Sequence, residues 1–266
     1  MARWIARIMA LTVLAPWAGC RLPGYVAPQP ALDGNARIEY LLRVPQEVLP
    51  PEHSLFAELN AMPAAIREAL ELPPAGQNVR VYLFEDRDQY RSFLDDVYPH
   101  LPDRRAYFVS VDGELAVYAY WSEQTRADLR HELTHAVMHA SLAEVPLWLD
   151  EGLAEYFEVP ADRNGFNSAH VAMLAQSMAE GWQPDLARLE TYTEVSDMNR
   201  RDYAEAWAWV HWLLSGPPER NDLLVGYLQS PLDGTTRLGP QIAGVVKDPA
   251  AALVEHLGGL TTPASN

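Results

Sequence analysis

Cysteine is almost absent from this sequence of 266 residues, since Cys20 is its single example. One cysteine cannot form an internal disulfide, so a disulfide framework is excluded. Cations are also scarce: 20 Lys and Arg stand against 36 Asp and Glu, and the formal net charge is −16. Because phosphate binding needs clustered Lys and Arg, this balance argues against nucleic acid as a partner. It also disfavours direct adsorption to anionic membrane surfaces.

The apolar run near the N-terminus is short. It extends from Ile8 to Gly19, which is not enough to span a bilayer as a helix. Arg3 and Arg7 precede it, and a charged region followed by a short apolar region is typical of an export signal. We therefore expect residues 1–20 to be a signal peptide that directs the protein to the bacterial cell envelope.

Cys20 follows directly on this apolar run. The segment Ala18-Gly19-Cys20 is similar to the end of a bacterial lipobox, in which the cysteine is lipidated, although Trp17 stands where lipoboxes usually carry Leu. We expect a lipid anchor at Cys20, and membrane attachment through that anchor alone. The alternatives are nearby cleavage by ordinary signal peptidase and an uncleaved anchor.

The rest of the chain is expected to form one folded domain. Residues 21–36 are rich in Pro, Gly and Ala without periodicity, which indicates a tether. Hydrophobic residues make up 48% of the chain, enough to fill the core of a domain at 37–260, with a tail at 261–266. The residue patterns predict strands at 36–44, 79–84, 106–111 and 114–120. They predict helices at 51–72, 88–97, 123–142, 147–158, 167–180, 202–215, 219–229 and 248–257.

The predicted strands come early in the chain and most predicted helices come late. Asp112-Gly113 separates two strand-like runs, and this is the turn chemistry of a two-residue hairpin. The order predicts an α+β fold rather than an alternating doubly wound sheet. We expect a small antiparallel or mixed N-terminal sheet followed by a mostly helical part.

A histidine pair lies in the predicted helix at 123–142. Residues 131–135 read His-Glu-Leu-Thr-His. On a helix, residues four apart share one face, so two neutral imidazoles can reach a single zinc ion. Glu132, beside the first histidine, can then reach a water at the metal. The alternative is a surface helix with two solvated histidines. An apolar stripe on a different face favours the metal site; it consists of Leu129, Leu133, Ala136, Val137 and Ala140.

A catalytic zinc needs a third protein ligand and one open position. His139 continues the four-residue spacing, but its Cα is expected about 12 Å along the helix axis from that of His131. We therefore interpret His139 as a capping or solvated residue. The metzincin extension is excluded, because Met138 and Ser141 occupy the positions that it would fill with Gly and His.

A second motif follows at residues 148–156 and reads Trp-Leu-Asp-Glu-Gly-Leu-Ala-Glu-Tyr. Together the two motifs resemble the gluzincin metallopeptidases, and above all the small bacterial peptidase MA-like group. The resemblance is strongest over 79–158 and extends more weakly through 203–214. It implies a zincin-like fold with the histidine helix at the cleft, and one zinc ion held by His131, His135 and Glu151. It also implies that Glu132 activates a water to hydrolyse peptide bonds.

The glutamates of the predicted helix at 147–158 share one face. Glu151, Glu155 and Glu158 follow the spacing i, i+4 and i+7, which alone also fits a solvated acidic face. Gly152 favours close helix packing, because a glycine inside a helix costs about 1 kcal/mol relative to Ala. Asp150 is expected to point elsewhere and is the second choice as ligand. Glu155 is expected to accept a hydrogen bond from a zinc-binding histidine, with a simple surface glutamate as the alternative.

The expected reaction uses Glu132 as general base, which takes a proton from water and passes it to the leaving amine. The tetrahedral intermediate needs a further donor. We assign this role to Tyr203, in the later segment of the resemblance, with His211 as second choice. The alternative is that this tryptophan-rich helix is plain core.

The strand at 114–120 is expected to offer an open edge to a peptide substrate, with an ordinary paired strand as the alternative. The predicted function is therefore a zinc metallopeptidase with a peptide or protein substrate. Two other functions stay open. One is a non-catalytic zinc-binding or interaction module of the cell envelope, which would not need Glu132. The other is a different zinc amide hydrolase on the same scaffold.

Overall fold

The computed structural model describes residues 34–44, 54–111, 113–231 and 235–261. The expected export signal, with Cys20, lies outside the described residues. Gly34 and Ala36, which we expected at the end of the tether, belong to the described fold: Gly34 O accepts a hydrogen bond of 2.8 Å from Ala75 N, and Ala36 is buried. Among the described residues, no helix is both long enough and apolar enough to cross a membrane.

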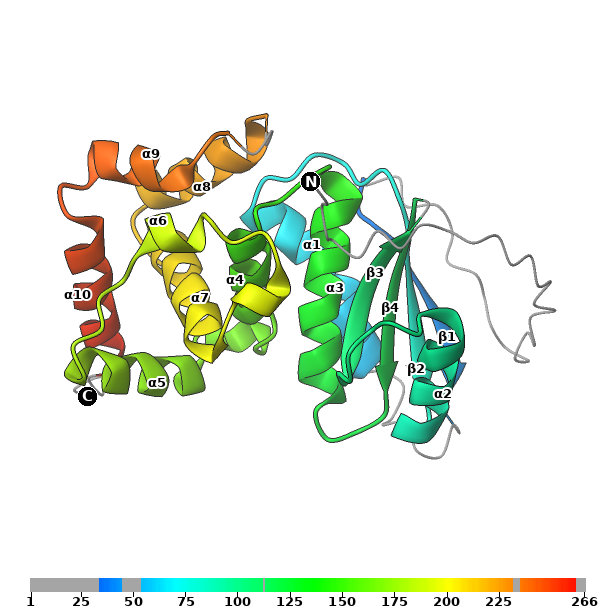
Figure 1. The fold of residues 1–266 in the computed structure, drawn as a ribbon. Coiled ribbons are helices and arrows are strands. Elements are labelled where there is room, and N and C mark those ends of the chain that lie inside the picture. Colours follow the sequence, from blue (N-terminus) through cyan, green and yellow to red (C-terminus); the bar gives the residue numbers. More distant parts are fainter. Residues whose placement is uncertain (1–33, 45–53, 112, 232–234, 262–266) are drawn as a thin grey trace.

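The fold is α+β, as predicted, with a small mixed sheet followed by a mostly helical part (Figure 1). The strands are β1 (Ile38–Arg43), β2 (Val79–Phe84), β3 (Ala106–Val111) and β4 (Glu114–Tyr120). The helices of the first half are α1 (Leu55–Ala69), α2 (Arg87–Val97), α3 (Thr125–Ser141) and α4 (Leu147–Phe157). Those of the second half are α5 (Ser168–Ala179), α6 (Leu186–Leu189), α7 (Arg200–Leu214), α8 (Pro218–Gln229), α9 (Leu238–Val245) and α10 (Pro249–Thr261).

The strand order of the sheet is β1-β2-β4-β3. β1, β2 and β4 run parallel, whereas β3 runs antiparallel to β4 with Phe108 opposite Val117. β4 therefore pairs on both sides, and our expectation that it offers an open edge is wrong. The chain enters β4 through the hairpin from β3, but β4 lies beside β2, which leaves β3 at one edge of the sheet and β1 at the other.

The two faces of the sheet bury different side chains because residues alternate along a strand. Val79, Val81 and Leu83 of β2 belong to the main core, which also includes the apolar stripe of α3. Phe84, at the end of β2, belongs to a separate cluster on the face that α2 covers. The sheet face opposite α2 therefore packs against α3, the helix that carries the histidine motif.

The helical part is built around α7, against which α4 packs (Figure 1). Gly152 makes this contact possible: a Cβ at this position would lie 2.7 Å from the Ala206 carbonyl oxygen. Our interpretation that Gly152 serves close helix packing is confirmed. Trp207, Trp209 and Trp212 of α7 are all fully buried, so most of this helix is indeed core. α7 begins at a capping box, which fixes where its first turn meets the loop before it.

Candidate functional site

α3 presents the histidine motif towards α4. His131 and His135 lie one turn apart, with ring centroids separated by 5.0 Å and ring planes at 77°. His135 is 7% exposed and Glu151, on α4, is 6% exposed. Two buried polar side chains, with the half-buried His131 beside them, need partners, because an unpaired buried polar group is costly. The packing of α3 against α4 therefore holds these side chains together, unlike a cluster of solvated surface residues.

The ligand atoms of these three residues converge. Nε2 of His131 lies 3.5 Å from Oε2 of Glu151, and Nε2 of His135 lies 3.7 Å from the same oxygen. The three side chains form a group whose ligand atoms all lie within 4.8 Å of one another. Two ligand atoms that are each about 2.0–2.1 Å from a tetrahedral zinc ion lie about 3.4 Å apart. Geometry and donor types both fit one zinc ion, with His131, His135 and Glu151 to hold it.

The other ring nitrogens of the two histidines contact carboxylates. Nδ1 of His131 lies 3.2 Å from Oε2 of Glu158, and Nδ1 of His135 lies 3.0 Å from Oδ1 of Asp150. The first contact is a hydrogen bond, which can fix the ring orientation and tautomer of a metal-binding histidine, whereas the second is an ion-pair contact without hydrogen-bond geometry. We had assigned this task to Glu155. That assignment needs correction, because Glu155 accepts a hydrogen bond of 2.7 Å from Nε2 of His170 instead.

Asp150 also contacts a third histidine. Its Oδ2 lies 3.1 Å from Nε2 of His139, one turn beyond His135. The ring of His139 stacks on Phe108 of β3, with centroids 5.4 Å apart. His139 is therefore neither a ligand nor a solvated side chain. His139 contacts one carboxylate oxygen of Asp150, and the other oxygen contacts His135.

The carboxylates around the two histidines favour positive charge in this site. Burial lowers the pKa of His135, but Asp150 and Glu151 outweigh it and bring that pKa to about 9. For His131, burial is likewise outweighed, by Glu151 and Glu158, and its pKa lies well above the ordinary value. An environment that stabilises protonated imidazoles so strongly is also favourable to a divalent cation.

Glu132 faces β3 rather than α4. Its Oε2 accepts a hydrogen bond of 2.6 Å from the backbone N–H of Phe108. Burial raises the pKa of Glu132 above its ordinary value, while His131 and His135 act in the opposite direction. A carboxylate with a raised pKa is suited to accept and return a proton near neutral pH.

Tyr203 and His211 of α7, the two candidate donors to the tetrahedral intermediate, have different surroundings. Burial is the main cause that raises the pKa of Tyr203, and charges on Glu151, Arg104 and Glu155 also act on it. Tyr203 is therefore within electrostatic reach of Glu151, and its side chain interacts with Arg104. His211 does not belong to the ligand group: its Nδ1 lies 2.8 Å from Nε2 of His256 on α10.

His131 is shared with a second group of potential ligands, which it forms with Glu155 and Glu158. We favour the group with His135 and Glu151 as the metal site, because two imidazoles and one carboxylate are the usual catalytic zinc set of this kind. In that arrangement Glu158 keeps its contact with Nδ1 of His131.

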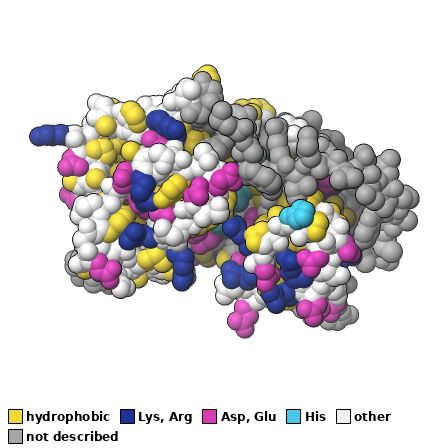
Figure 2. All heavy atoms as spheres, viewed as in Figure 1, with side chains coloured by type: hydrophobic (Ala, Val, Ile, Leu, Met, Phe, Trp, Pro, Cys, Tyr) yellow, Lys and Arg dark blue, Asp and Glu magenta, His cyan; other side chains and the backbone are white. Residues whose placement is uncertain are grey.

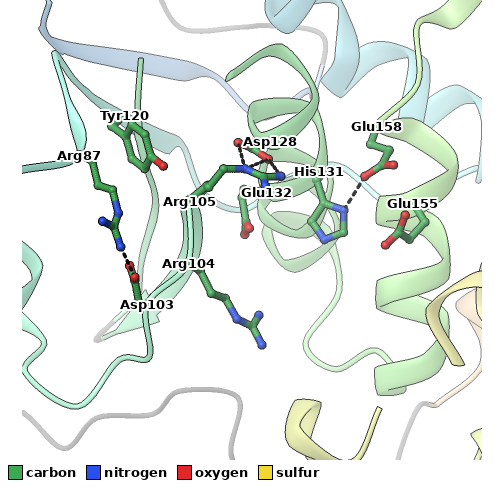
Figure 3. A pocket seen from close by; sticks show the side chains of 11 residues that line it. Arg87, Asp103, Arg104, Arg105, Tyr120, Asp128, His131, Glu132, Glu155 and Glu158 are labelled. Atoms are coloured by element: carbon green, nitrogen blue, oxygen red, sulfur yellow. Dashed lines mark hydrogen bonds and ion pairs between the residues drawn. The ribbon is translucent and has the colours of Figure 1, made fainter. Parts of the chain in front are cut away.

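A cavity of about 450 Å³ opens beside His131 and Glu132. Figure 3 shows its walls: Arg104 and Arg105 come from the segment that leads into β3, Glu155 comes from α4, and Glu158 directly follows that helix. The volume is within the range of small-molecule and peptide-binding pockets. On the face drawn in Figure 2, acidic and basic side chains of the described residues are interspersed rather than gathered into a patch of one sign.

Sequence reasoning missed the roles of Glu158, Asp150 and His170. Glu158 and Glu155 lie on the same helical face, so the spacing could have suggested either as the partner of His131. No spacing rule points to His170, which approaches from α5.

Comparison with known proteins gives little more. A family model described as a protein of unknown function (DUF1570) matches residues 126–232. The match begins in α3 and ends after α8, so it includes His131, His135 and Glu151. No curated protein matches the chain.

Proposed function

We propose that this protein is a zinc metallopeptidase in which His131, His135 and Glu151 hold the ion. The observation that carries the proposal is the convergence of their three ligand atoms, with carboxylates on both outer ring nitrogens. A zinc ion in this group would lower the pKa of a bound water and polarise a substrate carbonyl.

Glu132 is the general base of the proposed reaction. It takes the proton of the attacking water and delivers it to the leaving amine. Its contact with Phe108 holds the carboxylate on the sheet side of the histidines. Burial supports the role, since it makes the carboxylate a better proton acceptor.

Tyr203 is the proposed donor to the oxygen of the tetrahedral intermediate. Its pKa is raised, so the phenol keeps its proton and can donate it in a hydrogen bond. The tyrosine comes from α7, whose position relative to α4 is fixed by the close contact at Gly152.

β3 is the proposed docking edge for an extended peptide, in place of β4. On an antiparallel strand, alternate residues direct their backbone N–H and C=O groups to the same side. Because Phe108 directs its N–H away from β4, to Glu132, the backbone groups of Ala106 and Ser110 also face this open side. Main-chain pairing there would accept many substrate sequences.

The rival function is a non-catalytic zinc-binding module of the cell envelope. Glu132 argues against it, because a structural site has no use for a carboxylate with a raised pKa that lines the cavity beside His131. We further propose that the protein acts after export, on peptides or proteins of the envelope, either free or anchored by a lipid at Cys20.

The test uses the chain from Arg21 onward, loaded with zinc, and a mixed peptide library read by mass spectrometry. Glu132→Gln, which keeps an oxygen for Phe108, should reduce cleavage by about 10²–10⁴-fold with zinc content unchanged. Tyr203→Phe should reduce the turnover number by about 10²-fold, also at full zinc content. A wild-type protein that holds zinc but cleaves no peptide would favour the non-catalytic module or a different amide hydrolase.

A further inference from the structure

The cavity beside His131 and Glu132 is lined almost throughout by titratable side chains. Ala106 and Tyr120 are the neutral small and aromatic members, and the remaining lining residues are arginines, carboxylates and His131. Such a wall gives an apolar side chain little to contact. Whatever occupies this cavity must therefore be recognised through charge and hydrogen bonds.

The carboxylates of the lining already have partners. Asp128 receives a bidentate interaction from Arg105, with Nε and Nη2 at 2.9 and 2.8 Å from its two oxygens. Asp103 pairs with Arg87. As described above, Glu132 accepts from Phe108 N, Glu155 from His170, and Glu158 contacts His131. The acidic groups of the wall are thus engaged within the protein.

Arg104 differs from the other two arginines of the wall. Among the described residues, no carboxylate lies within the 4.0 Å of an ion pair with its guanidinium, and Figure 3 shows the side chain extending away from the labelled carboxylates. Its polar partner is the neutral hydroxyl of Tyr203, which leaves the positive charge unneutralised. Its guanidinium carbon lies 5.9 Å from the ring centre of Tyr107, which can steady the side chain. The positive charge is therefore available to a ligand.

Arg104 lines the same cavity as His131, one of the proposed metal ligands. Its charge acts on Tyr203, on which the charge of Glu151 also acts. Arg104 thus reaches from the sheet part towards α7, across the cavity that His131 and Glu132 border. A ligand held by Arg104 would have its neighbouring atoms next to the proposed base.

We propose that Arg104 is the carboxylate-binding residue of this cavity, and that the enzyme prefers peptides which present a carboxylate close to the bond that is cleaved. The proposal rests on the proposed peptidase function and specifies its substrate class. The planar guanidinium matches a carboxylate through two parallel hydrogen bonds, which a lysine ammonium cannot reproduce. The carboxylate belongs either to the peptide C-terminus or to an acidic side chain.

The test measures binding, so that it does not depend on turnover. All proteins carry Glu132→Gln and are loaded with zinc. The probes are fluorescently labelled alanine tetrapeptides: one with a free C-terminus, one with a C-terminal amide, and amidated ones with a single Glu or Gln. Arg104→Ala and Arg104→Lys are compared with the parent. Lys247→Ala, between α9 and α10, is the control for the loss of one positive charge outside the cavity.

We expect the parent to bind at least one carboxylate probe about tenfold or more tightly than its neutral counterpart. Arg104→Ala should abolish this ratio, Arg104→Lys should retain a part of it, and Lys247→Ala should leave it unchanged. Tighter binding of the free C-terminus than of the C-terminal amide identifies an exopeptidase subsite. Tighter binding of the Glu peptide than of the Gln peptide identifies a subsite for an acidic side chain. Equal binding of both members of each pair, or a ratio that survives Arg104→Ala, would overturn the proposal.

The two proposals fail in different ways. If the ratio depends on Arg104 but the wild-type protein cleaves none of the carboxylate peptides, Arg104 remains a carboxylate-binding residue and the peptidase function is wrong. If the wild-type protein cleaves peptides but the Glu132→Gln parent shows no ratio, the peptidase function stands and the role of Arg104 is wrong.

Discussion

The Oδ1 atom of Asp150 on α4 lies 3.0 Å from the Nδ1 atom of His135 on α3. This contact joins the two helices at the point where the proposed ligands meet. Since Glu151 is the next residue, α4 supplies one ligand and the orientation of another from a single turn. The packing of α4 therefore determines the metal site as much as the histidine motif does.

Removal of the carboxylates that contact the Nδ1 atoms of His131 and His135 should weaken metal binding without removing a ligand. Asp150→Asn and Glu158→Gln are each expected to lower zinc affinity by about 10–100-fold, because the imidazoles lose the charged carboxylates that contact their Nδ1 atoms. Competition with a chromogenic chelator measures the affinity. An affinity equal to that of the wild-type protein in both variants would contradict the role that we assign to these contacts.

The close approach of α4 and α7 should make Gly152 sensitive to a single methyl group. Gly152→Ala would place its Cβ 2.7 Å from the Ala206 carbonyl oxygen, so we expect a loss of about 1–3 kcal/mol in the free energy of unfolding. Gly226, inside α8, is the matched control, because a Cβ there would meet nothing within 4 Å. Gly226→Ala should stabilise the protein by up to about 1 kcal/mol.

Urea denaturation of the two glycine variants checks the prediction. Equal effects of Gly152→Ala and Gly226→Ala on the denaturation midpoint would mean that α4 and α7 are not packed as closely as described. A fall in zinc affinity for Gly152→Ala alone would show that helix packing also positions Glu151.

The contact between His211 on α7 and His256 on α10 predicts a loss of stability in acid. Burial, and then the nearby His256, lower the pKa of His211 to about 4 from an ordinary value of 6.5. Because the unfolded chain binds the proton more readily, stability is fully present above about pH 6.5 and falls as the pH drops towards 4. At about 1.4 kcal/mol per pKa unit, and with allowance for partial solvent screening, we expect a loss of about 2 kcal/mol.

The histidine prediction is checked by urea denaturation between pH 7 and pH 4, with a metal chelator in every sample so that zinc release does not contribute. His211→Asn removes the titrating group and should flatten the pH dependence relative to the wild-type protein. A pH dependence that is identical in both proteins would show that His211 titrates normally in the folded state.

Local signals in the sequence were sufficient for much of the fold. β3 and β4 have the predicted bounds, because Asp112-Gly113 is a sequence typical of turns and the runs on either side are rich in β-branched and aromatic residues. The place of β4 inside the sheet could not be predicted in this way. It depends on pairing with β2, more than 30 residues earlier, and no local pattern encodes that register.

Two helices were missed for physical reasons. α6 has 4 residues, too few for a periodic pattern. α9 contains Gly239, Pro240 and Gly244, which are poor helix formers. Its first turn is stabilised by tertiary contacts, since Glu190 Oε1 accepts hydrogen bonds from the backbone N–H groups of Leu238 and Gly239.

In the site, too, local spacing predicted some features, whereas others depend on tertiary contacts. Helical spacing placed His131 and His135 on one face, and the resemblance pointed to Glu151; the structure brings all three together. The choice between Glu155 and Glu158 as partner of His131 could not be made from the sequence. It depends on His170, which reaches Glu155 from α5 and leaves the contact with His131 to Glu158.

The most direct test of the account compares two glutamates one turn apart on α4. Glu151→Gln and Glu155→Gln make the same chemical change, and bound zinc is measured by elemental analysis after dialysis of each purified protein against the metal. We predict one zinc ion per chain in the wild-type protein and in Glu155→Gln, and a large loss in Glu151→Gln. Zinc retained by Glu151→Gln and lost from Glu155→Gln would place the ion with Glu155 and Glu158, and no zinc in the wild-type protein would contradict the metal site altogether.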